Sequence, residues 1–161
     1  MLVENVKVNI SGMEIEVSKG TNLLEISKMF NKEGRKPIIA KVNGEICELN
    51  IIPSNNDEIE FLDLTNPVAN RVYINGLILL INYAFNELFH GKNIITVKHS
   101  VDKSVCIETS SKITKTELSD VEKKMKSIVD ANLPITKVTV LKTEAIEYFN
   151  KTNDLSKVHL L

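Results

Sequence analysis

The stretch from Arg71 to Phe89, RVYINGLILLINYAFNELF, constrains this chain more than any other part of it. It is long enough for a major helix, contains no His, Cys, Asp or Lys, and has Glu87 as its one carboxylate. A helix that is apolar over so much of its surface is normally buried, so we expect a core helix here. The run LILLI is far shorter than the ~20 apolar residues that span a bilayer, which predicts no membrane contact.

Charge is divided unevenly along the chain. The 161 residues are 43% apolar, enough for a packed core, and their net charge is −1, which gives no global electrostatic case for nucleic acid. Residues 1–66 carry 7 Lys/Arg against 11 Asp/Glu, a net charge of −4, whereas residues 67–161 carry 13 against 10, a net charge of +3. This asymmetry indicates two units with different partners. The opening MLVENVKVNI does not resemble a signal peptide, so we expect a cytoplasmic protein.

The first unit shows a regular order of strand and helix signals. Residues 3–17 alternate about the turn Ser11-Gly12 and predict a β-hairpin. A short amphipathic helix follows Thr21 or Asn22, either of which can cap it. Asn43-Gly44 is a strong type I′ turn signal inside a second hairpin, and EIEFLDL predicts a last strand. Hairpin, helix, hairpin and strand is the order of a β-grasp domain, which we place at residues 1–65.

The second unit, residues 66–161, begins after Thr65 with Asn66-Pro67 as the boundary signal. Its long helix should end near Gly91, which can supply a left-handed stop. Thr114 and Glu117 form a capping-box pattern for a later helix. The expected order is helix 68–89, strands 94–97 and 104–109, a helix after 114, strand 136–141, helix 143–150 and strand 157–161. The chain as a whole is predicted to be α+β.

Few residues have the spacing of a catalytic or metal site. The histidines His90, His99 and His159 are scattered, and Cys47 and Cys106 lie in separate units, so we expect no metal site. There is no phosphate-binding Gly-x-x-x-x-Gly-Lys-Ser/Thr loop. Three lysines on the helix after 114 are candidates for phosphate or RNA contacts, with a solvated, charge-balanced helix face as the alternative: Lys123, Lys124 and Lys126.

Four stretches of the first unit and three of the second resemble known domains. SKGTNLLEIS and PIIAKVNGEICELN, with the opening hairpin and the closing IEFLDL, resemble a TGS domain. That domain is a small β-grasp module of threonyl-tRNA synthetases, stringent-response synthetases and some GTPases. AFNELF, LSDVEKKMKSIVDANLPITKVTVLKTEAIEYF and LSKVHLL resemble the editing-type domain that follows TGS in threonyl-tRNA synthetase. The second domain is expected to be truncated at its C-terminal end.

The resemblance implies where the editing histidines would stand. An ungapped alignment on AFNELF places the two histidines of the synthetase pattern at Asn75 and Leu79. Neither residue ligates a metal or shuttles a proton, so no catalytic residue and no metal are predicted. We expect at most a vestigial cleft, with these candidate lining residues: Tyr73, Asn75, Leu79 and Tyr83.

A second family has the same front half without the histidines. These are the clostridial-type nucleoside kinases, described as uridine kinases, which FLDLTNPVANRVY resembles. This resemblance implies a non-catalytic regulatory or nucleotide- or RNA-binding region, with tRNA or a nucleotide as ligand. It is expected to precede a kinase domain that uses ATP and Mg²⁺, whereas this region itself has no cofactor. The alternative is the N-terminal part of a divergent threonyl-tRNA synthetase. A homo-oligomer, formed through the apolar helix, is a further expectation.

Overall fold

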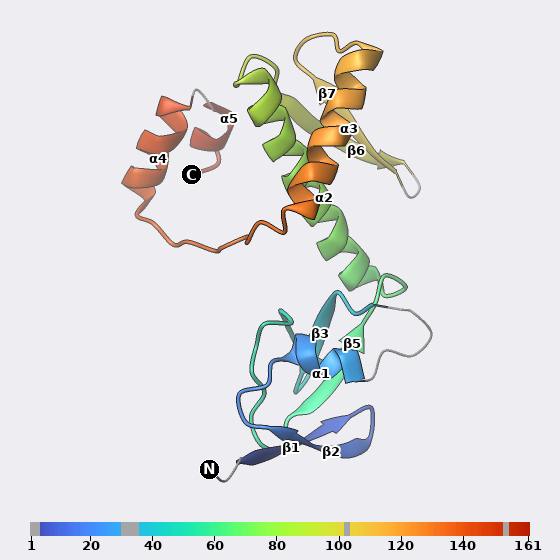
Figure 1. The fold of residues 1–161 in the computed structure, drawn as a ribbon. Helices are drawn as coiled ribbons and strands as arrows, with labels where there is room; N and C mark the ends of the chain where they lie inside the picture. Colours follow the sequence, from blue (N-terminus) through green and yellow to red (C-terminus); the bar gives the residue numbers. More distant parts are fainter. Residues whose placement is uncertain (1–3, 30–35, 102–103, 153–154) are drawn as a thin grey trace. The chain divides into compact units, whose positions relative to one another are not determined.

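The computed structural model describes residues 4–29, 36–101, 104–152 and 155–161, with the side chains of residues 99–101 and 155–156 left out. The chain divides into two compact units, Met1–Leu77 and Ile78–Leu161 (Figure 1). The division falls inside one long helix, and the predicted domain boundary after residue 65 stays a prediction. The elements are β1 (Asn5–Ile10), β2 (Met13–Ser18), α1 (Leu23–Met29), β3 (Ile39–Val42), β4 (Glu45–Cys47), β5 (Glu58–Leu62), α2 (Pro67–Phe89), β6 (Ile95–Val101), β7 (Ser104–Thr109), α3 (Lys115–Asp130), α4 (Lys142–Lys151) and α5 (Leu155–Val158).

The first unit is a five-stranded mixed sheet with one short helix on it. The strand order is β2-β1-β5-β3-β4, with β1 parallel to β5 and the other pairs antiparallel. Alternate strand residues and the apolar side of α1 meet in one core, because successive strand side chains point to opposite faces. The buried members of this core are Val8, Ile10, Val17, Leu23, Ile26, Ala40 and Ile59. This arrangement confirms the α+β fold class and the predicted β-grasp order.

Asparagine side chains fix three local structures in the first unit. Asn22 caps α1, since its Oδ1 accepts a hydrogen bond from the Glu25 amide at 2.9 Å. Asn43 and Gly44 have φ values of 52° and 85°, as a type I′ turn requires. The Asn43 side chain also accepts from the Glu58 amide at 2.9 Å, which ties the turn to β5. At the start of α2, Asn66 Oδ1 accepts from the Val68 amide at 2.9 Å.

The second unit packs the end of α2, the β6–β7 hairpin and α3 around a small core. Its buried members are Ala84, Phe85, Ile95 and Val121. The predicted capping box of α3 is confirmed, because Thr114 Oγ1 accepts from the Glu117 amide at 3.2 Å and Glu117 Oε2 accepts from the Thr114 amide at 2.8 Å. The α4 and α5 helices pack mainly on each other, with Lys157 Nζ 5.4 Å from the centre of the Phe149 ring.

Two predicted strands of the second unit are wrong. Residues 136–141 are irregular, and residues 155–158 form the short helix α5, so no strand covers 157–161. The TKVTVL stretch has strand-like alternation, but a strand is stable only when its backbone groups pair with a neighbour. Among the described residues, the second unit has only the β6–β7 pair, and neither edge of that pair takes up this segment.

The expectation that α2 is a core helix holds for only part of its surface. Ala69, Ala84 and Phe85 are buried, whereas Leu79 is 51% exposed and Tyr83 is 46% exposed. The reason is that α2 is apolar around most of its circumference, while the elements packed on it cover one side. By length and composition alone, α2 is also long and apolar enough to cross a membrane. Soluble proteins contain such helices too, and the absence of a membrane stays a prediction.

Candidate functional site

Three of the four predicted cleft residues share one face of α2. Asn75, Leu79 and Tyr83 follow one another at intervals of four, which places them on the same side of a helix with about 100° per residue. All three are exposed. Tyr73 is also exposed, but its position two residues before Asn75 points it roughly 160° away. The structure therefore brings together Asn75, Leu79 and Tyr83, which we call the α2 face, and leaves Tyr73 on another side of the helix.

The α2 face carries no group suited to acid–base or metal chemistry. An amide and an alkyl side chain replace the two imidazoles that the synthetase resemblance implies at positions 75 and 79, and Tyr83 adds a phenol. Asn82 lies on the neighbouring flank of α2. Its side-chain amide donates a hydrogen bond to the Ile78 carbonyl oxygen at 2.9 Å, so this amide is already paired within the helix. Over the described residues, no group of three His, Cys, Asp or Glu side chains converges to hold a metal ion. What this face offers is apolar contact, one phenol ring and one free-standing amide.

The three candidate phosphate-binding lysines are each paired with a carboxylate. Lys123 Nζ lies 3.3 Å from Asp120, Lys124 Nζ lies 3.4 Å from Glu87, and Lys126 Nζ lies 2.7 Å from Glu122. The hydrogen bond from Lys126, with its positive charge, lowers the pKa of the Glu122 carboxyl, and the same contact raises the pKa of Lys126. A phosphate would have to displace these carboxylates. The arrangement favours the alternative, a charge-balanced surface of α3.

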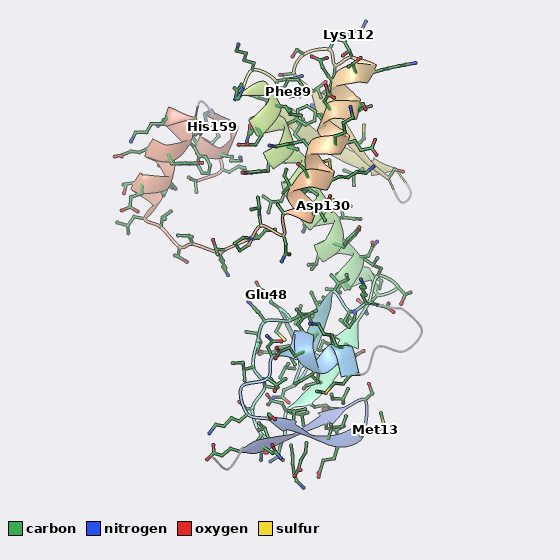
Figure 2. All side chains as sticks on the ribbon, viewed as in Figure 1. Met13, Glu48, Phe89, Lys112, Asp130 and His159 are labelled. Atoms are coloured by element: carbon green, nitrogen blue, oxygen red, sulfur yellow. The ribbon has the colours of Figure 1, made fainter. Side chains whose placement is uncertain are left out.

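Of the remaining candidate residues, His90 and His159 lie apart, whereas His99 of β6 and Cys106 of β7 are opposite one another in the hairpin register. His90 ends α2 in a left-handed conformation, with φ of 50°. His159 follows α5 and lies on the α4–α5 pair (Figure 2). The side chain of His99 lies outside the described residues. Cys106 is exposed, and Cys47 is half-buried; burial raises the pKa of the Cys47 thiol, and the Asp57 carboxylate raises it further. Among the side chains that the structure describes, these positions assemble no nucleophile with a base beside it.

No pattern in the sequence indicated an open hollow on the first unit. Its volume is about 540 Å³. The Lys41 ammonium lies 3.0 Å from the Glu60 carboxylate in this hollow. The turns at Gly12 and Gly44 border this hollow. A local pattern predicts each turn, but only the strand order brings the two turns near one another. The lining residues are Ser11, Gly12, Lys41, Gly44, Glu58, Ile59 and Glu60.

Sequence comparison relates the chain to one class of enzymes. No protein-family profile matches it. It is 29% identical to the threonine–tRNA ligase of Aquifex aeolicus, over 99% of this chain and 25% of the relative. The threonine–tRNA ligases of Wigglesworthia glossinidia brevipalpis and Rubrobacter xylanophilus are 26% and 27% identical, over 96% and 83% of this chain. The chain spans about a quarter of the length of these relatives. The predicted resemblance to threonyl-tRNA synthetase is confirmed at this level, and these relatives give no support to the kinase resemblance.

Proposed function

We propose that this chain is the TGS-like and editing-like N-terminal region of a cytoplasmic protein related to threonyl-tRNA synthetases, and that it binds the acceptor end of tRNA without hydrolysing it. The similarity to threonine–tRNA ligases over nearly the whole chain supports the relationship. The observation that carries the non-catalytic part is the chemistry of the α2 face, where Asn75 and Leu79 occupy the positions implied for two histidines.

Ester hydrolysis needs a group that takes a proton from water or a metal that acidifies it. The Asn75 amide is neutral at physiological pH and is a poor base, and Leu79 has no polar atom. Tyr83, the third residue of the α2 face, has a phenol hydroxyl, and the face holds no imidazole or carboxylate to take up its proton. Binding therefore fits this face better than catalysis.

The same residues suit an unpaired nucleotide. The Tyr83 ring is 46% exposed, and proteins recognise unstacked bases by aromatic stacking with hydrogen bonds to base edges. The Asn75 amide has both a donor and an acceptor for such an edge. The net charge of +3 over residues 67–161 adds a weak attraction to the RNA backbone.

Two assays with the purified chain test this proposal. Serine-charged threonine tRNA should be deacylated no faster than in buffer alone, and turnover by the chain would contradict the non-catalytic part. Binding of the uncharged tRNA should weaken about 5- to 150-fold in Tyr83→Ala, the range that corresponds to a lost base stack. Tyr73→Ala is the matched control, because Tyr73 has a similar exposure on another side of α2. If both variants bind the uncharged tRNA equally well, the tRNA does not bind at the α2 face.

The uridine kinase remains the second candidate for the parent protein. Two features support this candidate. Neither position 75 nor position 79 holds a histidine, and the sequence of residues 61–73, FLDLTNPVANRVY, resembles that family. The coding sequence after residue 161 distinguishes the two candidates. A phosphate-binding loop there, with ATP and Mg²⁺ as its ligands, would favour the kinase, whereas the motifs of a class II synthetase would favour the leading proposal.

A further inference from the structure

Asn43 has the neighbour that makes an asparagine chemically labile. The backbone nitrogen of the next residue can attack the side-chain Cγ of an asparagine, and a glycine leaves that nitrogen most open because it has no side chain. Asn-Gly occurs twice in the chain, at residues 43–44 and at residues 75–76. Asn43 is exposed at the β3–β4 turn, so water reaches it. Among the described residues, the Gly44 amide has no hydrogen-bond acceptor, which leaves its nitrogen available.

The second Asn-Gly pair provides a comparison within the same chain. Asn75 and Gly76 lie inside α2, where each backbone N–H donates to the carbonyl oxygen four residues earlier. The Gly76 nitrogen is therefore committed to the helix, and the regular helical backbone holds it away from the Asn75 side chain. The two pairs have the same chemistry and differ in backbone structure, which favours reaction at Asn43.

Two side-chain hydrogen bonds hold the Asn43 carboxamide in place. Its Nδ2 donates to the Asp57 carboxylate at 2.8 Å, and its Oδ1 accepts from the Glu58 amide at 2.9 Å. Asp57 is itself fixed, since its other carboxylate oxygen accepts from the Ser54 amide at 2.7 Å. We call the two side-chain bonds of Asn43 the turn latch. The carboxamide has to leave this latch before it can turn toward the Gly44 nitrogen.

We propose that Asn43 is a deamidation site that the turn latch controls. When the latch opens, the Gly44 nitrogen gives up its proton and bonds to the Asn43 Cγ, which closes a succinimide ring. The carboxamide nitrogen leaves as ammonia. Water then adds to either carbonyl of the ring and leaves aspartate or isoaspartate at position 43. The whole reaction consumes one water and releases one ammonia, with no change of oxidation state.

The product cannot close the same latch. A carboxylate at position 43 has no proton to donate to Asp57, and two ionised carboxylates at the 2.8 Å separation of the present bond repel each other. Isoaspartate also inserts a side-chain carbon into the backbone of a two-residue turn, whose geometry sets the strand register. Deamidation would thus mark, irreversibly, a first unit that has opened at this turn. The inference concerns the first unit alone and is independent of any tRNA bound at the α2 face.

Ageing the purified chain in mildly alkaline buffer, followed by peptide mass spectrometry over time, tests the site. In the folded chain, Asn43 should convert faster than Asn75. In the chain unfolded by urea, the two pairs should convert at similar rates, and Asn43 should convert at least about 5-fold faster than in the folded chain, the factor for one hydrogen bond. Equal rates at Asn43 in the folded and unfolded chains, or faster conversion of Asn75 in the folded chain, would overturn the proposal.

A variant of the latch tests its control of the reaction. Asp57→Asn removes the acceptor for the Asn43 Nδ2 but keeps an oxygen for the Ser54 amide, and it should speed the conversion of Asn43 at least about 5-fold. Ile26→Val is the matched control for lost stability, because Ile26 is fully buried in the core and takes no part in the latch. A similar acceleration in both variants, or none in Asp57→Asn, would show that the latch does not control the reaction.

Exchanging donor and acceptor tests the effect of the product. Asn43→Asp should lower the urea midpoint of the first unit by roughly 0.5–1 M, followed by hydrogen exchange at the amides of β5. The double variant Asn43→Asp with Asp57→Asn restores one donor and one acceptor in the opposite direction, so it should recover most of that loss. An unchanged midpoint in the single variant, or no recovery in the double variant, would refute the claim that the product keeps the latch open.

Discussion

Exchanging Phe85 and Leu79 for alanine, one at a time, tests which side of α2 is the core. Phe85 is 3% exposed and packs in the buried cluster, with its ring centroid 5.1 Å from that of Phe89. Phe85→Ala should therefore cost about 3–5 kcal/mol of the unfolding free energy, the usual loss for a buried phenylalanine. Leu79 is already 51% exposed, so Leu79→Ala should cost about 1 kcal/mol or less. The first loss is a large share of the ~5–15 kcal/mol that holds a domain folded.

The assay has to report on the second unit by itself, because two compact units can unfold separately. Urea unfolding can be monitored by hydrogen exchange at the amides of α3. These amides report on the second unit, because Val121 of α3 packs in the same core as Phe85. The measurement belongs at low protein concentration, where a homo-oligomer formed through α2 would be dissociated. Equal losses for the two variants, or a larger loss for Leu79→Ala, would refute the assignment of the core side of α2.

Three further predictions follow from the capping box and from the α2 face. Thr114→Ala should destabilise the second unit by about 1 kcal/mol, as loss of an N-cap does, measured as a lower urea midpoint with an unchanged slope. Hydrogen bonds from the Thr114 side chain, and then from its backbone, lower the pKa of the Glu117 carboxyl below its ordinary value. The stability that Glu117 adds should thus be complete near neutral pH and should disappear as the pH falls through that lowered pKa, so the gap between wild type and Thr114→Ala should narrow in acid. The double variant Asn75→His with Leu79→His should gain a zinc-dependent rise in melting temperature, because histidines four residues apart share a helix face. Asn75→His with Leu77→His is the control, and a zinc shift as large in the control would show that the helix register is wrong.

The sequence predicted most of the first unit because its signals are local. Asn43-Gly44 specifies a type I′ turn by backbone conformation alone, and alternation specifies which strand residues face the core. Asn22 and Thr21 were both open as the cap of α1, and only the structure shows the hydrogen bond to the Glu25 amide. The hollow between the glycine turns was missed, because strand order, which brings distant turns together, is not written in any local pattern.

The second unit was predicted less well for the opposite reason. The α3 helix has its own capping box and amphipathic pattern, and both were correct. The strand expected at 136–141 depends on a partner that the pattern cannot name, and in this structure the segment stays irregular. The α2 helix is apolar on nearly all sides, so periodicity gave no way to tell its buried side at Phe85 from its exposed side at Leu79.

For the candidate site, the cleft stays a prediction, and helix spacing says only which of its residues share a side of α2. Residues 75, 79 and 83 share a face by arithmetic alone, whereas Tyr73 was included for its residue type and lies on another side. The lysines of α3 were weighed against a charge-balanced surface, and the ion pairs of Lys124 and Lys126 favour that reading. Ion pairs between elements, such as the one from Lys124 to Glu87, need the packing of two helices before they can be foreseen.

The strand order of the first unit also determines when its sheet can form during translation. β5 is the last strand of the sheet in the chain, yet it lies between β1, the first, and β3. A ribosome therefore releases both hairpins, β1–β2 and β3–β4, before the strand that joins them exists, and neither hairpin is stable alone. Translation must pass Leu62 before this unit can close, so a pause shortly upstream would hold two unjoined hairpins exposed to chaperones and proteases.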